Sequence, residues 1–266
     1  MQIVTIDGRP VRYVESGDPG GAPLVLVHAF PVGVGMFDPQ RGAFPGRRII
    51  APALPGFDGS APLAAPSVDA YARHVIGLLD ALRIDRAVLG GVSLGGYVLF
   101  GVLRQAAARV AGIMLADTRS AADTGEARAG RIRMLGVLRD KGVPAVAADM
   151  LPKLLGETSR RRQPGLAQSV TRMIEGQTAE GIAAAIEVLM SRPDSTPLLR
   201  RLAVPALVVV GAEDGLTTPG EMERMASQVP GAQFVSVPGA GHLSNLENPP
   251  AFNQAVAQWL GLLHWT

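Results

Sequence analysis

The chain has 266 residues, of which 47% are hydrophobic and 18% charged, a globular composition that excludes intrinsic disorder. It has no cysteine, which excludes disulfides, thiolate metal sites and thiol nucleophiles. The formal charge is only +2, and the basic residues are spread thinly apart from Arg160 to Arg162, so nothing in the charge indicates binding to nucleic acid.

The start of the chain, "MQIVTIDGRP", has no basic segment followed by an apolar block. No apolar run approaches the roughly 20 residues that a membrane span needs. We therefore expect no signal peptide, no membrane partner and a cytoplasmic location.

Two segments of alternating character open the chain, at residues 2–7 and 11–16, and a turn at Gly8 separates them. This pattern predicts a β-hairpin. A continuous apolar run at 24–27 follows a turn cluster, and another strand-like segment occupies 47–57. Continuous apolar runs are typical of central strands in a parallel sheet.

A helix is predicted at 67–84, with Ser67 as its N-cap. Its apolar positions recur at helical spacing: Val68, Tyr71, Val75, Leu78 and Leu82. A strand at 86–92, a helix at 94–108 and a strand at 110–117 follow. Strands that alternate with helices predict a parallel sheet with crossover connections.

The pattern changes after Thr118, because residues 119–196 carry helical signals without strand signals. The predicted helices of this segment are 123–141, 143–155, 165–175 and 178–190. Strand and helix then alternate again, at 205–214, 219–229, 232–242 and 249–263. A helical block between two halves of one α/β sheet predicts a cap over the carboxyl edge of that sheet, where ligands bind in open α/β folds.

The stretch "GGVSLGG" places Ser93 at the predicted strand-to-helix junction, with Gly91 two residues before it and Gly95 two residues after. A G-x-S-x-G match is weak alone, but this junction is the context of a nucleophile elbow. The glycines fit a tight turn in which the strand and helix backbones leave no room for Cβ atoms. Ser93 is therefore our candidate nucleophile, and the alternative is a serine that only begins a helix.

A serine hydroxyl needs a base within hydrogen-bond reach, and the chain offers four histidines. His74 lies inside a predicted helix, His264 lies in the C-terminal tail, and His28 ends a strand and is expected to order its own loop. His242 follows the last predicted strand in a glycine-rich loop, at the sheet edge where Ser93 also lies. We assign the base to His242.

The base in turn needs a carboxylate to fix its tautomer and stabilise the imidazolium. Asp214 and Asp117 each follow a predicted strand and lie at the same edge of the sheet. Chain order permits either residue. Asp214 is favoured because its strand precedes that of His242, and consecutive strands are usually neighbours. Glu213 should point the other way and is expected to be structural.

A tetrahedral intermediate also needs two N–H donors for its negative oxygen. The backbone N–H of Leu94, directly after the candidate nucleophile, is one candidate. The loop "HAFP" supplies the other, the N–H of Phe30, because Pro31 has no N–H to donate. An ordinary turn remains the alternative reading of this loop.

The motifs "HAFP", "GVSLGG", "GAEDGLTTP" and "GHLSNLENP", in this order and spacing, resemble the α/β-hydrolase superfamily over essentially the whole chain. The stretches "LADTRSAADTGEARAGR" and "RPDSTPLL" are similar to segments of small bacterial carboxylesterases and of 3-oxoadipate enol-lactonases. The resemblance implies one domain over 1–266 with a mostly parallel eight-stranded sheet, flanking helices and an all-helical cap at 119–196. It also implies a Ser93–His242–Asp214 triad, an oxyanion hole at Phe30 and Leu94, and neither a metal nor an organic cofactor.

The sequence departs from this superfamily at two positions. Ala29 follows His28 where glycine is usual, and Asp58 replaces the second glycine of a Gly-x-Gly-x-Ser pattern. Neither change removes a catalytic group, but both could alter the shape of the pocket.

The leading hypothesis is a serine carboxylic-ester hydrolase, monomeric or homodimeric, that acts on short neutral esters through an acyl-enzyme. An enol-lactone hydrolase and a small-molecule sensor on the same scaffold are the alternatives, because function does not follow from fold. Arg131 and Arg133 of the cap could bind the carboxylate of a lactone substrate. An apolar roof over the pocket is expected from six cap residues: Leu135, Leu138, Met150, Leu151, Leu154 and Leu155.

Overall fold

The computed structural model describes residues 1–263 and has one eight-stranded sheet in the order β1-β2-β4-β3-β5-β6-β7-β8. The strands are β1 (Gln2–Ile6), β2 (Arg9–Gly17), β3 (Ala22–Val27), β4 (Arg47–Pro52), β5 (Ala87–Val92), β6 (Val110–Ala116), β7 (Ala206–Gly211) and β8 (Gln233–Val237). β1 and β2 pair antiparallel to their neighbours, and the remaining pairs are parallel. The predicted mostly parallel sheet is confirmed.

The hairpin between β1 and β2 turns on two residues, Asp7 and Gly8, which both have positive φ angles. An Asp-Gly pair with this conformation is the preferred two-residue hairpin turn. Residues Ile6 and Arg9 face each other directly across it. The local sequence therefore fixes the register of the first two strands.

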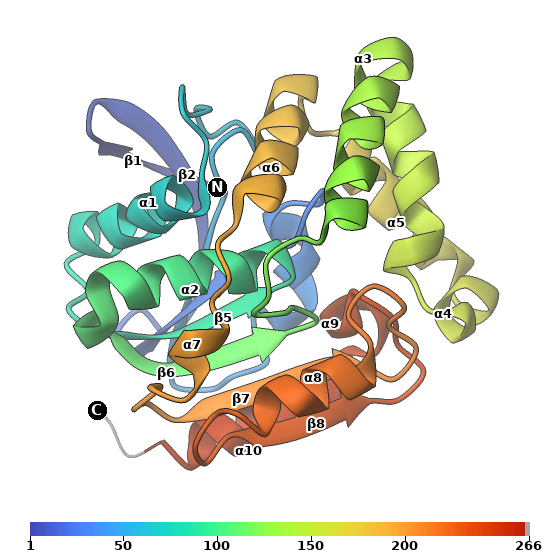
Figure 1. Ribbon diagram of the computed structural model, residues 1–266. Helices are drawn as coiled ribbons and strands as arrows, with labels where there is room; N and C mark the ends of the chain where they lie inside the picture. The colour runs from blue at the N-terminus through green and yellow to red at the C-terminus, as the bar shows by residue number, and fades with distance from the viewer. Residues whose placement is uncertain (264–266) are drawn as a thin grey trace.

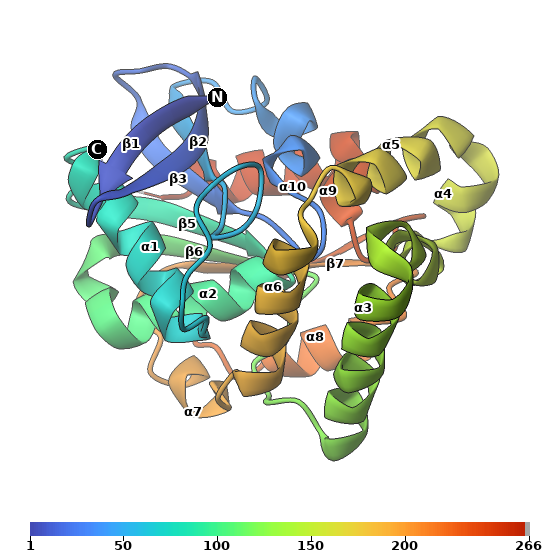
Figure 2. The same cartoon turned by 90° about the horizontal axis from the view of Figure 1, so that it is seen from above.

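Helices cover both faces of the sheet (Figures 1 and 2). On one face lie α1 (Val68–Ala81), α2 (Leu94–Ala106) and α8 (Pro219–Ala226), and on the other lies α10 (Pro249–Gly261). The hydroxyl of Ser67 accepts the Ala70 N–H at 3.1 Å, so the predicted N-cap of α1 is confirmed. Within residues 1–263, no helix is long and apolar enough to cross a membrane.

Between β6 and β7 the chain forms helices, most of which lie beyond the end of the sheet in Figure 1, whereas the last of them lies beside α2. They are α3 (Gly125–Leu154), α4 (Glu157–Arg162), α5 (Pro164–Glu175), α6 (Ala179–Ser191) and α7 (Thr196–Leu199). The two helices predicted at 123–141 and 143–155 form α3, which is interrupted at Gly142 with a φ of 75°. The helix begins at Gly125 and not at Asp123, because Thr124 is its N-cap. The short helices α4 and α7 were not predicted from the sequence.

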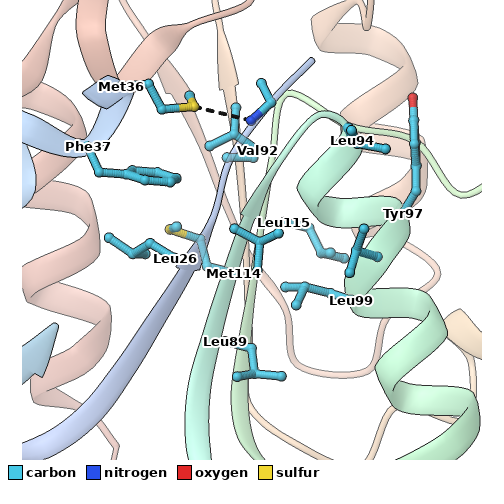
Figure 3. Close-up of a cluster of buried hydrophobic side chains, with 14 of the residues drawn as sticks. Leu26, Met36, Phe37, Leu89, Val92, Leu94, Tyr97, Leu99, Met114 and Leu115 are labelled. Atoms are coloured by element: carbon cyan, nitrogen blue, oxygen red, sulfur yellow. Dashed lines mark hydrogen bonds between the residues drawn. The ribbon is translucent and has the colours of Figure 1, made fainter. Parts of the chain in front are cut away.

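The core lies between the sheet and the helices that cover its faces, and Figure 3 shows part of this core around β5 and α2. Side chains from β3, β5 and β6, such as Leu26, Leu89 and Leu115, are at most 1% exposed. In the same cluster Met36 Sδ accepts the N–H of Ala29 at 3.2 Å. The loop after β3 is therefore attached to the core immediately before Phe30.

Candidate active site

Ser93 occupies the sharp turn between β5 and α2, with φ 52° and ψ −111°. A Cβ on Gly91 would lie 2.5 Å from the carbonyl carbon of Gly95, and one on Gly95 would lie 2.1 Å from the oxygen of Val27. Glycine is therefore required on both sides of the serine, because the backbones touch. Ser93 is only 8% exposed, so the turn is covered.

The structure brings Ser93, His242 and Asp214 together from three separate loops at the carboxyl edge of the sheet. His242 Nε2 lies 2.8 Å from Ser93 Oγ, and His242 Nδ1 lies 2.8 Å from Asp214 Oδ2. Asp214 and His242 are each 3% exposed. An Nδ1–H that donates to the carboxylate leaves Nε2 free to accept the serine proton.

The Asp214 carboxylate is held by the turn that follows it. Oδ1 accepts the N–H groups of Leu216 at 2.7 Å and Thr217 at 3.0 Å, and Oδ2 accepts the Thr217 hydroxyl at 2.5 Å. Burial alone would raise the pKa of Asp214, but the charge of His242 and hydrogen bonds from His242 and Thr217 outweigh it and lower that pKa. Asp214 is therefore ionised where it contacts the imidazole.

Asp117, the alternative carboxylate, is fully buried at the end of β6 and makes no hydrogen bond to His242. Its Oδ1 accepts the Gly211 N–H at 2.8 Å, and its Oδ2 accepts the Ser244 hydroxyl at 2.5 Å. Burial and the Asp214 charge raise the pKa of Asp117 well above its usual value. Asp117 thus connects the end of β7 to the segment after His242 without contacting the imidazole.

Two of the other histidines have structural hydrogen bonds. His28 is fully buried, accepts the Leu54 N–H at Nε2 and donates from Nδ1 to the Ala29 carbonyl. His74 Nε2 contacts the Ala53 carbonyl at 3.1 Å, and burial lowers its pKa to about 4. His264 lies outside the described residues.

The backbone N–H groups of Phe30 and Leu94 are the two candidate oxyanion donors. Among residues 1–263, neither the Phe30 N–H nor the Leu94 N–H has a hydrogen-bond acceptor, whereas the Ser93 N–H donates to Ala116 O at 2.9 Å. Phe30 lines the cavity above Ser93, and Leu94 is the first residue of α2. The N-terminal end of a helix favours negative charge.

A cavity of about 580 Å³ opens onto Ser93 and His242, within the size range of small-molecule sites. Its apolar lining comprises Phe30, Tyr97, Met134, Val137, Met150, Leu189 and Leu216. Of the six residues predicted to form an apolar roof, Met150 lines the cavity. Leu138, Leu154 and Leu155 are instead buried in the core, because their side of the helix faces the rest of the protein.

Charged side chains also line this cavity. Arg192 is 3% exposed, pairs with Asp123 Oδ1 at 2.6 Å and lies over the ring of Tyr97, 4.4 Å from its centroid. Arg131 Nε faces Asp123 Oδ2 at 3.6 Å, and neither of these two atoms has a hydrogen bond to any residue that the structure describes. Arg133 lines the cavity as well, whereas the run Arg160 to Arg162 is exposed at the end of α4, as predicted.

Neither of the two departures from the superfamily pattern lines this cavity. Ala29 is fully buried beside Met36. Asp58 has a φ of 49°, accepts the Val34 N–H at 2.8 Å and exchanges hydrogen bonds with the side-chain amide of Gln177 in the cap. Asp58 therefore connects the cap to the loop that carries Phe30.

Asp58→Ala should lower the free energy of unfolding by about 2 kcal/mol, because the Val34 N–H loses its acceptor while the left-handed backbone remains. The matched control is Asp58→Asn, which tolerates this conformation and keeps an acceptor oxygen. Denaturant unfolding of both variants measures the effect. Equal stability of Asp58→Ala and the unchanged protein would contradict this role.

Three side chains that shape the site were not predicted from the sequence. Thr217 binds Asp214, Arg192 pairs with Asp123 in the cavity wall, and Glu247 contacts the backbone beside His242. Of these three residues, only Thr217 has a signal in the local sequence. An Asp side chain commonly accepts the backbone N–H groups two and three residues later, which forms an Asx-type turn. Among the residues described, no group of three or more His, Asp or Glu side chains could hold a metal ion.

Known proteins that are similar to this chain identify its protein family. Residues 24–255 match the model of the alpha/beta hydrolase family, and the chain belongs to that family. It is 30% identical to 3-oxoadipate enol-lactonase 2 of Acinetobacter baylyi over 74% of this chain and 72% of that protein.

Two solved structures are similar over nearly the whole chain. A thermophilic esterase from Thermogutta terrifontis, solved with malate bound, is 37% identical over all of both chains, with a TM-score of 0.95. The enol-lactonase from Burkholderia xenovorans LB400 is 25% identical over 98% of this chain and all of that chain, with a TM-score of 0.90. Family and neighbours together support a hydrolase.

Proposed function

We propose that this protein is a serine carboxylic-ester hydrolase with Ser93 as nucleophile, His242 as base and Asp214 as the acid that orients the base. The observation that carries the proposal is the continuous hydrogen-bonded path from Ser93 Oγ through the imidazole to Asp214, at the floor of a cavity. The esterase and enol-lactonase neighbours support the same reaction class.

In the proposed mechanism, His242 Nε2 takes the proton of Ser93 as Oγ attacks the ester carbonyl. The N–H groups of Phe30 and Leu94, which have no other acceptor in the described part of the chain, stabilise the oxyanion of the tetrahedral intermediate. His242 then protonates the departing alcohol. Water attacks the acyl-enzyme by the same route, with His242 again as the base, and releases the acid.

For the substrate we propose short neutral esters, with acyl chains of about two to six carbons. Phe30, Met134 and Met150 give the cavity an apolar lining that suits an uncharged acyl chain. The cap covers the site and so limits the length of that chain. Most cations of the lining already have acidic partners, as Arg192 has in Asp123 and Lys153 has in Asp149.

A lactone that carries a carboxylate is the second candidate, and Arg131 is the observation that favours it. This guanidinium lines the cavity, its side chain is 24% exposed, and among residues 1–263 its only acidic contact is the long one to Asp123. An arginine of this kind could bind a substrate carboxylate with two hydrogen bonds. The enol-lactonase relatives give this candidate further support.

The deciding measurement is kcat/KM for a short neutral aryl ester against kcat/KM for a carboxylate-bearing enol-lactone. We expect the ester to be the better substrate, and Arg131→Gln to change its kcat/KM by less than about threefold. Arg160→Gln, at an exposed arginine outside the cavity, is the control. A hundredfold preference for the lactone that Arg131→Gln abolishes would select the lactonase instead.

Sustained turnover separates an enzyme from a sensor. A hydrolase of this mechanism releases a burst of aryl alcohol and accumulates an acyl group on Ser93, which mass spectrometry of the digested protein detects. A protein that binds esters but forms no acyl-Ser93 and gives no turnover would be a sensor.

A further inference from the structure

A second buried carboxylate lies on the other side of the histidine loop. Glu247, the last residue of α9 (Ser244–Glu247), is 2% exposed. Its Oε1 accepts the Leu243 N–H at 3.1 Å and its Oε2 accepts the Gly156 N–H at 2.8 Å. The Gly241 N–H also donates to this carboxylate.

These bonds fix the backbone on both sides of His242. The N–H groups of Gly241 and Leu243, its two neighbours, both donate to Glu247. The N–H of His242 itself donates to the Leu154 carbonyl at 3.1 Å. Three successive backbone N–H groups around the base are therefore held, two of them by Glu247 and one by Leu154 at the end of α3.

The cap reaches this loop at Gly156. A Cβ on Gly156 would lie 2.8 Å from the Gly241 nitrogen, so the two backbones are in direct contact. Glu247 joins them, because it accepts N–H groups from both residues. The helix that ends beside Gly156, α3, carries Met134 and Met150 in the cavity lining. A continuous path of contacts thus leads from the cavity wall to the backbone of the base.

The chemistry of the site requires the ionised form of Glu247. Its three backbone partners are all donors, and a carboxylate has only acceptor oxygens. Burial raises the pKa of Glu247 above its usual value, because its effect exceeds that of the hydrogen bonds, which lower the pKa. A glutamine of the same shape would direct its side-chain NH2 group, which is a donor, at backbone N–H groups that are also donors.

We propose that Glu247 is a positioning residue. It holds His242 at hydrogen-bond distance from both Ser93 and Asp214, and it couples the position of His242 to that of the cap. The proposal rests on the function proposed above. Glu247 does not line the cavity, and the hydrogen bonds that it accepts from backbone N–H groups do not involve the imidazole, so its effect is on the orientation of the base. A misplacement of the base by a fraction of an ångström lowers the rate of proton transfer more than it lowers substrate binding.

The first test compares Glu247→Gln with Glu213→Gln. Glu213 is exposed and holds the same cap turn through the Thr158 N–H and hydroxyl, at 2.8 and 2.5 Å, without bonding the backbone of the base. We expect Glu247→Gln to lower kcat on the order of 10²-fold with KM changed less than about threefold, and Glu213→Gln to leave kcat within about threefold.

The second test uses Gly156→Ala. This substitution keeps Glu247 and places a methyl group of the cap against the loop that carries Gly241 and His242. Gly156 has a φ of −62°, which alanine adopts freely, so only the contact with Gly241 and Glu213 is strained. The control is Gly136→Ala, on the same helix α3, where a Cβ would meet nothing within 4 Å. We expect a fall in kcat of about tenfold or more for Gly156→Ala and none for Gly136→Ala.

A readout without substrate is the low-field proton resonance of the His242 Nδ1–H bonded to Asp214. It should be sharp in the unchanged protein and in Glu213→Gln, and broadened or lost in Glu247→Gln and Gly156→Ala. An unchanged resonance in folded Glu247→Gln overturns the proposal, as does an equal loss of kcat in Glu213→Gln. If the protein hydrolyses no ester, the proposed function fails, but this resonance still decides the role of Glu247.

Discussion

Ser93→Ala is expected to lower kcat for ester hydrolysis by a factor on the order of 10⁶, because the nucleophile and its base act as one unit. His242 Nε2, 2.8 Å from Ser93 Oγ, would have no proton to take, and no acyl-enzyme could form. The substitution removes one oxygen from a turn whose shape depends on Gly91 and Gly95, so the fold should be unchanged.

Steady-state kinetics on a short aryl ester measures this effect, and circular dichroism checks the fold. The matched control is Thr118→Val, because the Thr118 hydroxyl donates to the Ser93 carbonyl at 2.8 Å but does not face the imidazole. Its loss should lower stability by about 1 kcal/mol with little effect on kcat. Ester hydrolysis retained by a pure Ser93→Ala preparation would contradict the proposed mechanism.

The sheet could be predicted from the sequence because its strands carry local signals. The run 24–27 is continuously apolar and becomes a strand that is buried on both faces. The hairpin at Gly8 and the cap of α1 at Ser67 likewise depend on a few adjacent residues. Ser93, Asp214 and His242 each follow a strand, and a parallel sheet brings such positions to one edge.

The cap interior could not be predicted in this way. Which side of α3 faces the cavity depends on its orientation against the sheet, and the break at Gly142 changes that orientation between its two halves. The pair of Arg192 with Asp123 joins residues 69 positions apart, which no local pattern indicates. The contact of Glu247 with Gly156 spans 91 positions. Tertiary packing alone creates these contacts, and the first of them lies in the wall of the cavity.

The two carboxylates at the edge of the sheet illustrate why side-chain partners matter more than position. Asp117 and Asp214 both follow strands, and the sequence allowed either to serve as the acid. Electrostatics now separates them, because burial and the charge of Asp214 raise the pKa of Asp117, whereas the charge of His242 and hydrogen bonds lower that of Asp214 against its burial. The residue that contacts the imidazole is thus the one whose pKa is lowered.

Asp214→Asn is expected to lower kcat by roughly 10⁴, because the amide favours the wrong tautomer of His242 and no longer stabilises the imidazolium. Asp117→Asn should lower kcat by less than about tenfold, since Asp117 bonds to Gly211 and Ser244 and leaves the imidazole untouched. Kinetics of both variants on the same short ester compares the two carboxylates directly. The asparagine variants have nearly the shape of the carboxylates, so a difference between them reports the contact with His242 and not a general loss of packing. If Asp117→Asn instead loses the larger factor, the acid belongs to β6, and the roles of Ser93 and His242 are unaffected.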